Sequence, residues 1–533
     1  MSTVAQSPGG GSAEEGTESN APANGLERPY AESVRLSPPR RVPSPFRWHT
    51  TRVSFVQAWR YGLRAVFATR SHMLFDFVAQ LPGHDDVIRA RAPAKLLLVR
   101  NADYAHRILV ANQNSYAKGA EYDLLAVGLG RGLVTNLDDD SWRAHRRLVQ
   151  PVFGKRHVDG FAAPMTDAVA AVSERWQRDH PDGKLDIAAE MSGLSLDIIG
   201  RTMFGTELPG NTAAQIRDAF ARLRRLSGVS VITGAAYPAR MIANILWRFG
   251  PGRHGAQDPR LVVRVLRWVV RVLERDTYRG LVLIESFVEQ QIAAYHAEPA
   301  KRQDNLLALL VESTDPDTGD RFTDAEVRDE LMTFLGAAPT TTDGLAWTWV
   351  LLSRHPEVRE RLQSELDEVL AGRRPTVEDL QRLPWTRAVV EESMRLYPPV
   401  MAVARVAKRN DVLGRIPIEA GDTVVVLIHG AHHNPAIWSD PERFDPSRFL
   451  QDVAAPSARR ATMPFGAGRR MCIAATFARM EMALIVAMVS QRFELDLVPQ
   501  PPLRRENTLF GGPEGSVWMN LRQREAAPAS VRP

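Results

Sequence analysis

A short stretch near the C-terminus holds the residues best suited to bind a metal: Phe465, Gly466, Gly468, Arg470 and Cys472. Cys472 is the only cysteine among the 533 residues. An internal disulfide is therefore excluded, and the thiol is a packed small hydrophobe, a reactive group or a metal ligand. Neither glycine carries a Cβ, so the backbone can turn tightly and approach a flat ligand closely. The arginine favours the thiolate over the thiol, and a thiolate held in this way suits one axial position of a haem iron.

Two adjacent hydroxyl groups, those of Thr340 and Thr341, could handle protons on another element. They lie inside the segment 324–352, whose apolar pattern predicts one long helix. Pro339 precedes them and has no N–H, so we expect the carbonyl of Leu335 to lose its helical donor and the helix to kink there. A hydroxyl beside such a kink can hold an ordered water and relay a proton. The alternative is a threonine-rich core helix with no catalytic hydroxyl.

Two further pairs have the spacing of neighbours on a helix. Trp142 and Arg146 are four residues apart, so an indole N–H and a guanidinium can share one face as donors for a carboxylate. The alternative for this pair is a basic surface helix with an anchoring tryptophan. Glu392 and Arg395 are three residues apart and can form an ion pair, which would contribute little if it were exposed.

The remaining chain reads as helical segments with a few short strands. Helices are expected over 54–75 and 102–112, strands over 96–99 and 424–428, and a turn of a terminal hairpin over 510–513. Between Arg260 and Arg275, arginines recur every three or four residues among apolar side chains, which predicts a basic amphipathic helix. Its basic face is either solvated or a contact surface for an anionic membrane or an acidic partner.

Composition excludes several classes of protein. The net charge of +5 comes from 67 basic and 62 acidic residues, a balance that argues against nucleic-acid binding. Residues 1–45 are rich in Gly, Ser, Pro, Ala and Glu and are expected to be a disordered tail, so 46–533 would form one domain. No apolar run is long enough for a transmembrane helix or a secretory signal, so we expect a cytoplasmic protein. No carboxylate or cysteine has a ligand spacing that would make a separate metal site of His429, His432 and His433.

These motifs together carry a family resemblance. The pattern F-G-x-G-x-R-x-C-x-G of the cysteine-ligand loop in the cytochrome P-450 family matches from Phe465 onward, except that Ala474 replaces the last glycine. The W-x-x-x-R, threonine-rich, E-x-x-R and P-E-R-F motifs of that family precede it in the family order. The chain therefore resembles a soluble bacterial-type cytochrome P-450. The resemblance implies a mainly α fold with small β-sheets, shaped as a triangular prism, with haem b between the long central helix and the cysteine-ligand loop.

The resemblance also implies roles for individual residues. Cys472 would be the axial ligand, and Trp142, Arg146 and Arg405 would bind haem propionates beside Phe465, Gly466 and Arg470 of the loop. Thr341 takes the place of the oxygen-activating threonine, and Thr340 replaces the acid that usually precedes it. If the alignment is shifted by one residue, Thr340 becomes the candidate for the oxygen-activating threonine instead. Arg443, in Pro441-Glu442-Arg443-Phe444, would complete a buried network with Glu392 and Arg395.

The function implied is monooxygenation of an apolar organic substrate, by hydroxylation or epoxidation. Electrons would come from a ferredoxin and a ferredoxin reductase, fed indirectly by NAD(P)H. The missing acid and Pro339 leave open a peroxide-driven or rearranging enzyme, and a non-catalytic haem-thiolate binding protein is a further alternative. Peripheral membrane contact also stays open. The segments expected to line the substrate pocket are 120–134, 206–275, 336–341, 400–403 and 508–512.

Overall fold

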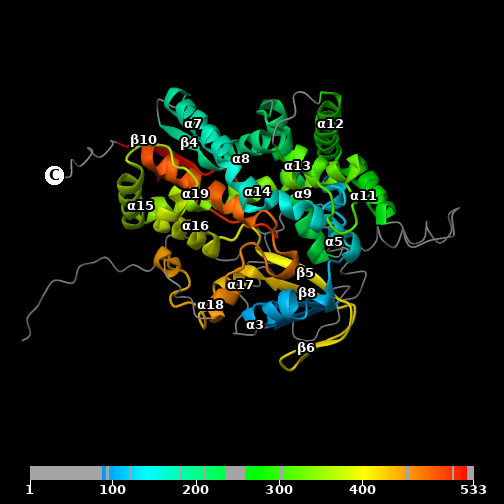
Figure 1. The fold of residues 1–533 in the computed structure, drawn as a ribbon. Helices are drawn as coiled ribbons and strands as arrows, with labels where there is room; N and C mark the ends of the chain where they lie inside the picture. Colours follow the sequence, from blue (N-terminus) through cyan, green and yellow to red (C-terminus); the bar gives the residue numbers. More distant parts are fainter. Residues whose placement is uncertain are drawn as a thin grey trace, which may run out of the picture.

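The computed structural model describes residues 87–91, 95–119, 122–179, 183–208, 210–233, 259–298, 305–450, 456–506 and 509–524. The expected tail over 1–45 and the expected helix over 54–75 lie outside the described residues. The described residues are mainly helical and carry small sheets, which confirms the fold class expected from the sequence (Figure 1).

The helices account for most of the described chain. The α-helices are α3 (Ala102–His106), α4 (Ala126–Leu129), α5 (Asp139–Val149), α6 (Lys155–Gly160), α7 (Ala162–Asp179), α8 (Ile187–Phe204), α9 (Gly210–Thr233), α11 (Pro259–Leu273), α12 (Arg275–Ala297), α13 (Leu306–Glu312), α14 (Asp324–Arg354), α15 (Pro356–Leu370), α16 (Pro384–Leu396), α17 (Ile428–His432), α18 (Pro456–Ala461) and α19 (Ala475–Arg492). Shorter helical turns include the π-helix η2 (Arg107–Ala111) and the 3-10 helices η3 (Gln113–Ser115), η5 (Gln150–Phe153), η7 (Asp379–Arg382), η8 (Pro446–Phe449) and η9 (Gly468–Arg470).

Helix α14 lies at the centre of the helical part of the molecule (Figure 1). Its first turn is fixed by a capping box, in which Thr323 accepts from the backbone N–H of Glu326 and the Glu326 carboxylate accepts from the backbone N–H of Thr323. Every residue over 341–352 is buried, as expected for a helix that packs on all sides. Its neighbours include α8, α12, α16 and α19. The helix predicted over 324–352 is therefore confirmed and extends two residues further.

The strands form a five-stranded sheet, a three-stranded sheet and a two-stranded ribbon within the described residues. The largest has the order β1-β2-β8-β5-β3, and only its β2–β8 pair is parallel. The strands predicted over 96–99 and 424–428 correspond to β2 and β8, each within one residue. The bounds are β1 (Val87–Arg91), β2 (Lys95–Val99), β3 (Tyr116–Ala117), β4 (Lys184–Asp186), β5 (Ala402–Ala407), β6 (Asp411–Leu413), β7 (Ile416–Ile418), β8 (Thr423–Leu427), β9 (Phe493–Leu497) and β10 (Trp518–Gln523).

Two apolar cores meet at the cysteine loop. One core fills the space between the helices around α14, and the other joins the five-stranded sheet to α3, η2 and α17. Phe465 and Ile473 pack against the helical core, whereas Ala467 packs against the core of the sheet. The loop that carries Cys472 therefore lies where the two parts of the molecule join.

The basic amphipathic segment differs from its prediction at one end. Helix α11 stops at Leu273 and α12 begins at Arg275, so the expectation of one helix through Arg275 is wrong. Glu274 separates the two helices and has non-helical backbone angles. Trp268 on α11 is 64% exposed. Across the described part of the chain, we find no helix whose length and apolar character would let it cross a bilayer.

Candidate functional site

The loop before Cys472 has a backbone that only glycine adopts without strain. Gly466 and Gly468 have φ angles of 75° and 71°. A Cβ on Gly468 would lie 1.8 Å from the carbonyl oxygen of Leu109, so the loop packs directly against the end of η2. The backbone N–H of Arg469 donates to Gln113 Oε1 at 2.7 Å, and that of Cys472 donates to the carbonyl of Phe465 at 3.0 Å. These contacts fix the position of the cysteine.

The surroundings of the Cys472 thiol determine how easily it loses its proton. Solvent reaches the side chain, yet burial among protein atoms raises the pKa of the thiol. The two observations agree if the thiol lines an internal space. The backbone N–H of Ala474 and the guanidinium groups of Arg146 and Arg479 oppose the rise, because they stabilise the thiolate. A sulfur atom with an open approach and nearby cations fits the axial ligand of a haem.

Helix α5 brings two of the predicted residues to this loop. The Nη1 of Arg146 donates to the carbonyl of Met471 at 3.0 Å. Trp142 is buried, and its ring centroid lies 4.2 Å from the guanidinium of Arg470. The structure thus places Trp142, Arg146 and Arg470 around the loop that carries Cys472.

Buried positive charge gathers on the same side of the loop. Arg470 donates to Asp139 Oδ1 at 2.7 Å and to the carbonyl of Asn136 at 3.0 Å. Burial lowers the pKa of Arg470; Asp139 opposes this, whereas Arg405 and Arg469 reinforce it. Arg405 is itself buried on β5. Guanidinium groups that repel one another inside a protein favour an added anion, and the carboxylates of a haem would supply one.

One face of α14 opens toward the interior. Ala337 is exposed and Thr340 is half-buried, although their neighbours Leu335 and Ala338 are buried. Ala337 and Thr340 are three residues apart, so they lie on one side of the helix. The Thr340 hydroxyl donates to the carbonyl of Ala337 at 2.7 Å. Thr341, the first choice from the sequence, is buried.

An acid that sequence reasoning missed lies behind Thr341. Glu481 is buried on α19, and burial raises its pKa to about 8 although hydrogen bonds from Ser195 and Thr341 oppose the rise. Ser195 Oγ lies 2.9 Å from Glu481 Oε1 and 3.4 Å from the carbonyl oxygen of Ala338. A hydroxyl has one proton, so a protonated Glu481 can donate to Ser195 while Ser195 donates to Ala338. The sequence feature that could have identified Glu481 is its position as the single acid in the otherwise apolar stretch of α19.

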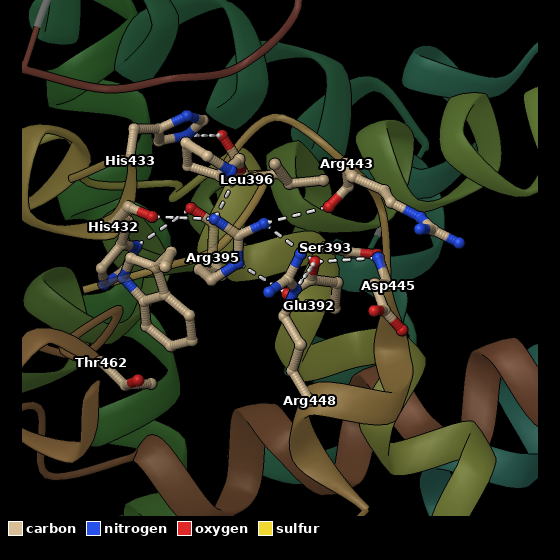
Figure 2. Close-up of polar contacts among 12 residues, drawn as sticks. Glu392, Ser393, Arg395, Leu396, His432, His433, Arg443, Asp445, Arg448 and Thr462 are labelled. Carbon is tan, nitrogen blue, oxygen red and sulfur yellow. Dashed lines mark hydrogen bonds and ion pairs between the residues drawn. The ribbon is translucent and has the colours of Figure 1, made fainter. Parts of the chain in front are cut away.

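The frame beneath the loop centres on a buried ion pair (Figure 2). Arg395 donates to Glu392 through Nε at 2.6 Å and Nη2 at 2.9 Å. Its Nη1 donates to the carbonyls of His432 and Pro441, both at 2.8 Å. Burial raises the pKa of Glu392, whereas the pairing with Arg395 opposes the rise.

The third member of this frame is not the one predicted. Arg443 contributes only its carbonyl, 3.3 Å from Arg395 Nη2, and its exposed side chain points away from Glu392 (Figure 2). Arg448 supplies the second guanidinium, with its Nε 3.5 Å from Glu392 Oε1. The error has a simple cause, because Pro-x-Arg-Phe occurs twice in succession and the sequence does not show which arginine turns inward.

His432 connects the frame to the cysteine loop. It is buried, and burial lowers its pKa to about 3, so the ring is neutral at physiological pH. Its Nε2 accepts from the backbone N–H of Met463 at 3.0 Å, and its Nδ1 lies 3.1 Å from the carbonyl of Arg395, to which it donates in this tautomer. The described part of the chain holds no group of three or more His, Cys, Asp and Glu residues that could bind a separate metal ion.

Comparison with known proteins agrees with this arrangement. A family model described as cytochrome P450 matches residues 88–517. A putative cytochrome P450 132 of Mycobacterium bovis is 33% identical over 84% of this chain and 92% of its own length. Cyclooctat-9-en-7-ol 5-monooxygenase of Streptomyces melanosporofaciens is 34% identical over 79% of this chain and 85% of its own. Pentalenene oxygenase of Streptomyces avermitilis is 28% identical over 80% and 88%. On this match, the chain belongs to the cytochrome P450 family and is a cytochrome P450 monooxygenase.

Proposed function

We propose that this monooxygenase holds its haem through Cys472 and transfers one atom of dioxygen to an apolar organic substrate. The observation that carries the proposal is the Cys472 thiol, which is accessible to solvent although surrounding atoms raise its pKa. Haem with a thiolate ligand supplies the activation of dioxygen when it is bound. Trp142, Arg146, Arg405 and Arg470 would bind the propionates, because they place donors and positive charge beside the loop.

Proton delivery is assigned to Thr341 and Glu481. The family usually places an acid directly before the threonine, and Thr340 stands there in this chain. Glu481 offers a carboxyl group from the neighbouring helix, and its pKa of about 8 keeps it protonated at neutral pH. Its hydrogen bond with Thr341 gives a short path for a proton toward the interior face of α14. The peroxide-driven alternative loses its main support, because an acid is available after all.

The substrate is proposed to be rich in hydrocarbon. Two relatives are named for cyclooctat-9-en-7-ol and for pentalenene. In this chain, a Cβ on Gly336 would lie 2.4 Å from Leu129 and 3.2 Å from Phe220, so apolar side chains crowd the helix face next to Ala337. An apolar substrate gains most from such a site.

The electrons are assigned to a ferredoxin and its reductase, supplied by NAD(P)H. Arg143 and Arg147 on α5 support this choice, because their side chains are 49% and 44% exposed on the helix that contacts the cysteine loop. Basic groups at this position suit an acidic electron donor.

The test is the spectrum of the reduced carbon monoxide complex. A thiolate ligand shifts the Soret band to long wavelength, so the haem-loaded protein should show this band and Cys472→His should lose it while still binding haem. Thr340→Ala should keep the band, because Thr340 belongs to α14 and not to the loop that carries Cys472. If the folded, haem-loaded protein lacks the band, sulfur ligation is wrong and the proposed oxygenase site is wrong with it.

A further inference from the structure

One segment of the chain, residues 129–136, reaches from the interior face of α14 to the guanidinium groups beside the cysteine loop. At its start, a Cβ on Gly336 would lie 2.4 Å from Leu129 Cδ2, so Leu129 packs on the helix next to Ala337. At its end, the carbonyl of Asn136 accepts from Arg470 Nη1 at 3.0 Å. The position of segment 129–136 therefore bears on both sides of the proposed haem site.

Two carboxylates of α14 hold the middle of this segment. Asp329 Oδ2 accepts from the backbone N–H of Arg131 at 2.7 Å. Glu330 Oε2 accepts from the backbone N–H of Leu133 at 3.1 Å. A Cβ on Gly132 would lie 2.7 Å from the carbonyl oxygen of Asp329 and 3.0 Å from Glu330 Oε2, so the backbone of the segment lies directly on the helix. The segment is thus attached to α14 through its main chain.

His145 of α5 completes this attachment. Its Nδ1 lies 2.8 Å from Glu330 Oε1, the other oxygen of the carboxylate that holds the segment. The Glu330 side chain is 0% exposed and that of His145 is 9% exposed, so solvent screens the pair little. His145 directly precedes Arg146, which donates to the carbonyl of Met471 at the cysteine loop. The pair consequently joins α5, α14 and segment 129–136 at one point.

The charges around the pair decide where its proton lies. Burial lowers the pKa of His145, but the carboxylates of Glu330 and Glu326 outweigh burial and raise it above the ordinary value of 6.5. His145 Nε2 lies 3.5 Å from Glu326 Oε1, so the imidazolium has a carboxylate on each side. Below the raised pKa, the pair is an imidazolium joined to a carboxylate by a charge-assisted hydrogen bond.

Other charges act on Glu330 rather than on the imidazole. Burial raises the pKa of Glu330, His145 and the backbone N–H of Leu133 oppose the rise, and Asp329 adds to it. Asp329 is itself paired with Arg328 at 2.9 Å. On the segment, the side chain of Arg131 pairs with Asp123 at 2.7 Å. The imidazolium of His145 is therefore the positive charge in direct contact with the buried Glu330 carboxylate.

We propose that His145 and Glu330 form a positioning pair, which holds segment 129–136 on α14 and so keeps Leu129 in place as part of the wall that a large apolar ligand of the haem site contacts. This proposal rests on the proposed function, because it needs the substrate to lie beside Ala337 on α14. The pair positions the wall and takes no part in the chemistry.

The pair makes this wall depend on pH. The folded pKa of His145 is raised, so the charge-assisted bond is complete below 6.5 and is lost as the pH rises through the raised value. Deprotonation leaves the buried Glu330 carboxylate without its adjacent positive charge, which weakens the attachment of the segment. A large ligand must then order the wall again when it binds, and its affinity falls.

The test compares a small and a large ligand of the iron. The small ligand is imidazole, and the large one is an imidazole with a phenyl group on the carbon away from the iron. Dissociation constants are measured on the haem-loaded protein from the shift of the Soret band. The constant for imidazole divided by that for the phenyl derivative is the size ratio, which reports contact with the wall because effects on the iron are common to both ligands. Glu330→Gln should lower the size ratio about fivefold at about pH 6.5.

The pH profile separates the charge of His145 from its hydrogen bond. His145→Asn keeps a neutral N–H donor near the place of Nδ1, so its wall should not respond to pH. The wild-type size ratio divided by that of His145→Asn should be about five at about pH 6.5 and should fall toward one by about pH 9. Protonation of the ligands is the same for both proteins and cancels in this comparison.

His296→Gln is the matched control. His296 lies 3.0 Å from Asp324 in the first turn of the same helix α14, but the two side chains are 45% and 66% exposed. An exposed pair of this kind contributes little, so the control should keep the wild-type size ratio at every pH.

The outcomes separate two kinds of failure. A size ratio that stays the same or rises in both Glu330→Gln and His145→Asn would overturn the positioning pair while leaving the haem site intact. If Glu330→Gln does not load haem, the comparison of the wild type with His145→Asn across pH still decides, and parallel profiles overturn the pair. If neither ligand shifts the Soret band of the wild type, the iron site itself is wrong, and the proposed function fails together with the pair.

Discussion

A carboxyl group inside a protein keeps its proton well above the pH at which it would lose it in water, and Glu481 is such a group. Burial raises its pKa from 4.5 to about 8. A neutral acid that contacts Thr341 can donate a proton, which leaves a buried carboxylate that must be protonated again before the next transfer. The acid absent from the sequence next to the threonines is therefore replaced, in space, by one from α19.

The two threonines can be separated by mutation. Thr341→Ala removes the hydroxyl that contacts Glu481, so we expect the ratio of product formed to electrons consumed to fall by about tenfold or more. Thr340→Ala is the matched control, because the Thr340 hydroxyl already donates to Ala337. The measurement is the consumption of NADH against product with saturating redox partners. If Thr340→Ala lowers the ratio of product to electrons more than Thr341→Ala does, then Thr340, and not Thr341, relays the proton.

The buried acid should also show itself in stability. Its folded pKa is raised, so its stabilising effect is complete below the unfolded value of 4.5 and is lost as the pH rises through about 8. The shift corresponds to at most about 5 kcal/mol in the free energy of unfolding. We expect Glu481→Gln to unfold at a higher temperature than the wild type at about pH 9, with the difference shrinking or reversing toward about pH 5.

The control for this experiment is Glu360→Gln, since Glu360 is exposed on α15. Its thermal unfolding should follow the wild-type dependence on pH. If Glu481→Gln and the wild type respond to pH in parallel, Glu481 does not hold a raised pKa in the folded protein.

At the scale of elements, the frame of α16, α17 and η8 supports the cysteine loop from beneath. Arg395 joins the helix to the carbonyls of His432 and Pro441, and His432 accepts from Met463, two residues before Phe465. The chain from α16 to the cysteine loop is thus one connected set of hydrogen bonds. Arg395 and His432 both have defined partners in this set, and buried hydrogen bonds of this kind hold their elements in one relative position.

Adjacent arginines offer a matched test of this frame. Arg448→Met removes a guanidinium from Glu392 and from the carbonyl of Asp440, so we expect the free energy of unfolding to fall by about 2 kcal/mol. Arg443→Met removes only an exposed side chain and should change it by less than about 0.5 kcal/mol. Urea titrations of both variants measure the two free energies of unfolding and show which arginine belongs to the buried network. A greater loss in Arg443→Met would restore Arg443 as the third member of the network.

Local sequence patterns predicted the helices and strands that are determined mainly by residues within the same segment. The apolar pattern of residues 324–352 predicted α14 within two residues. The break between α11 and α12 was not visible, because the arginine spacing continues across Glu274. The assignment of Arg443 to the buried network was wrong, because the arginine that reaches Glu392 is set by which turn packs under α16. That contact joins segments about fifty residues apart in the sequence.

At the scale of the whole molecule, motif order was enough to predict the family and its mainly helical fold. The spacing of the motif from Phe465 to Cys472 predicted the loop, because the backbone conformation of the loop depends on residues that are close together in the sequence. Glu481 and the His145–Glu330 pair were not predicted, since each depends on contacts between distant helices. The roles of Trp142 and the other candidates for binding the haem propionates stay predictions.

The contact between Gly468 and Leu109 has a consequence for synthesis of the chain. Gln113 leaves the ribosome 356 positions ahead of Arg469, the residue whose backbone it holds. The surface that receives the cysteine loop is made early, but it shares an apolar core with β5, β8 and α17, so it is completed only after residues 402–432 have been made. A nascent chain that stalls before residue 472 would lack the thiolate that we propose as the iron ligand, so under that proposal sulfur can retain the cofactor only once Cys472 has been made.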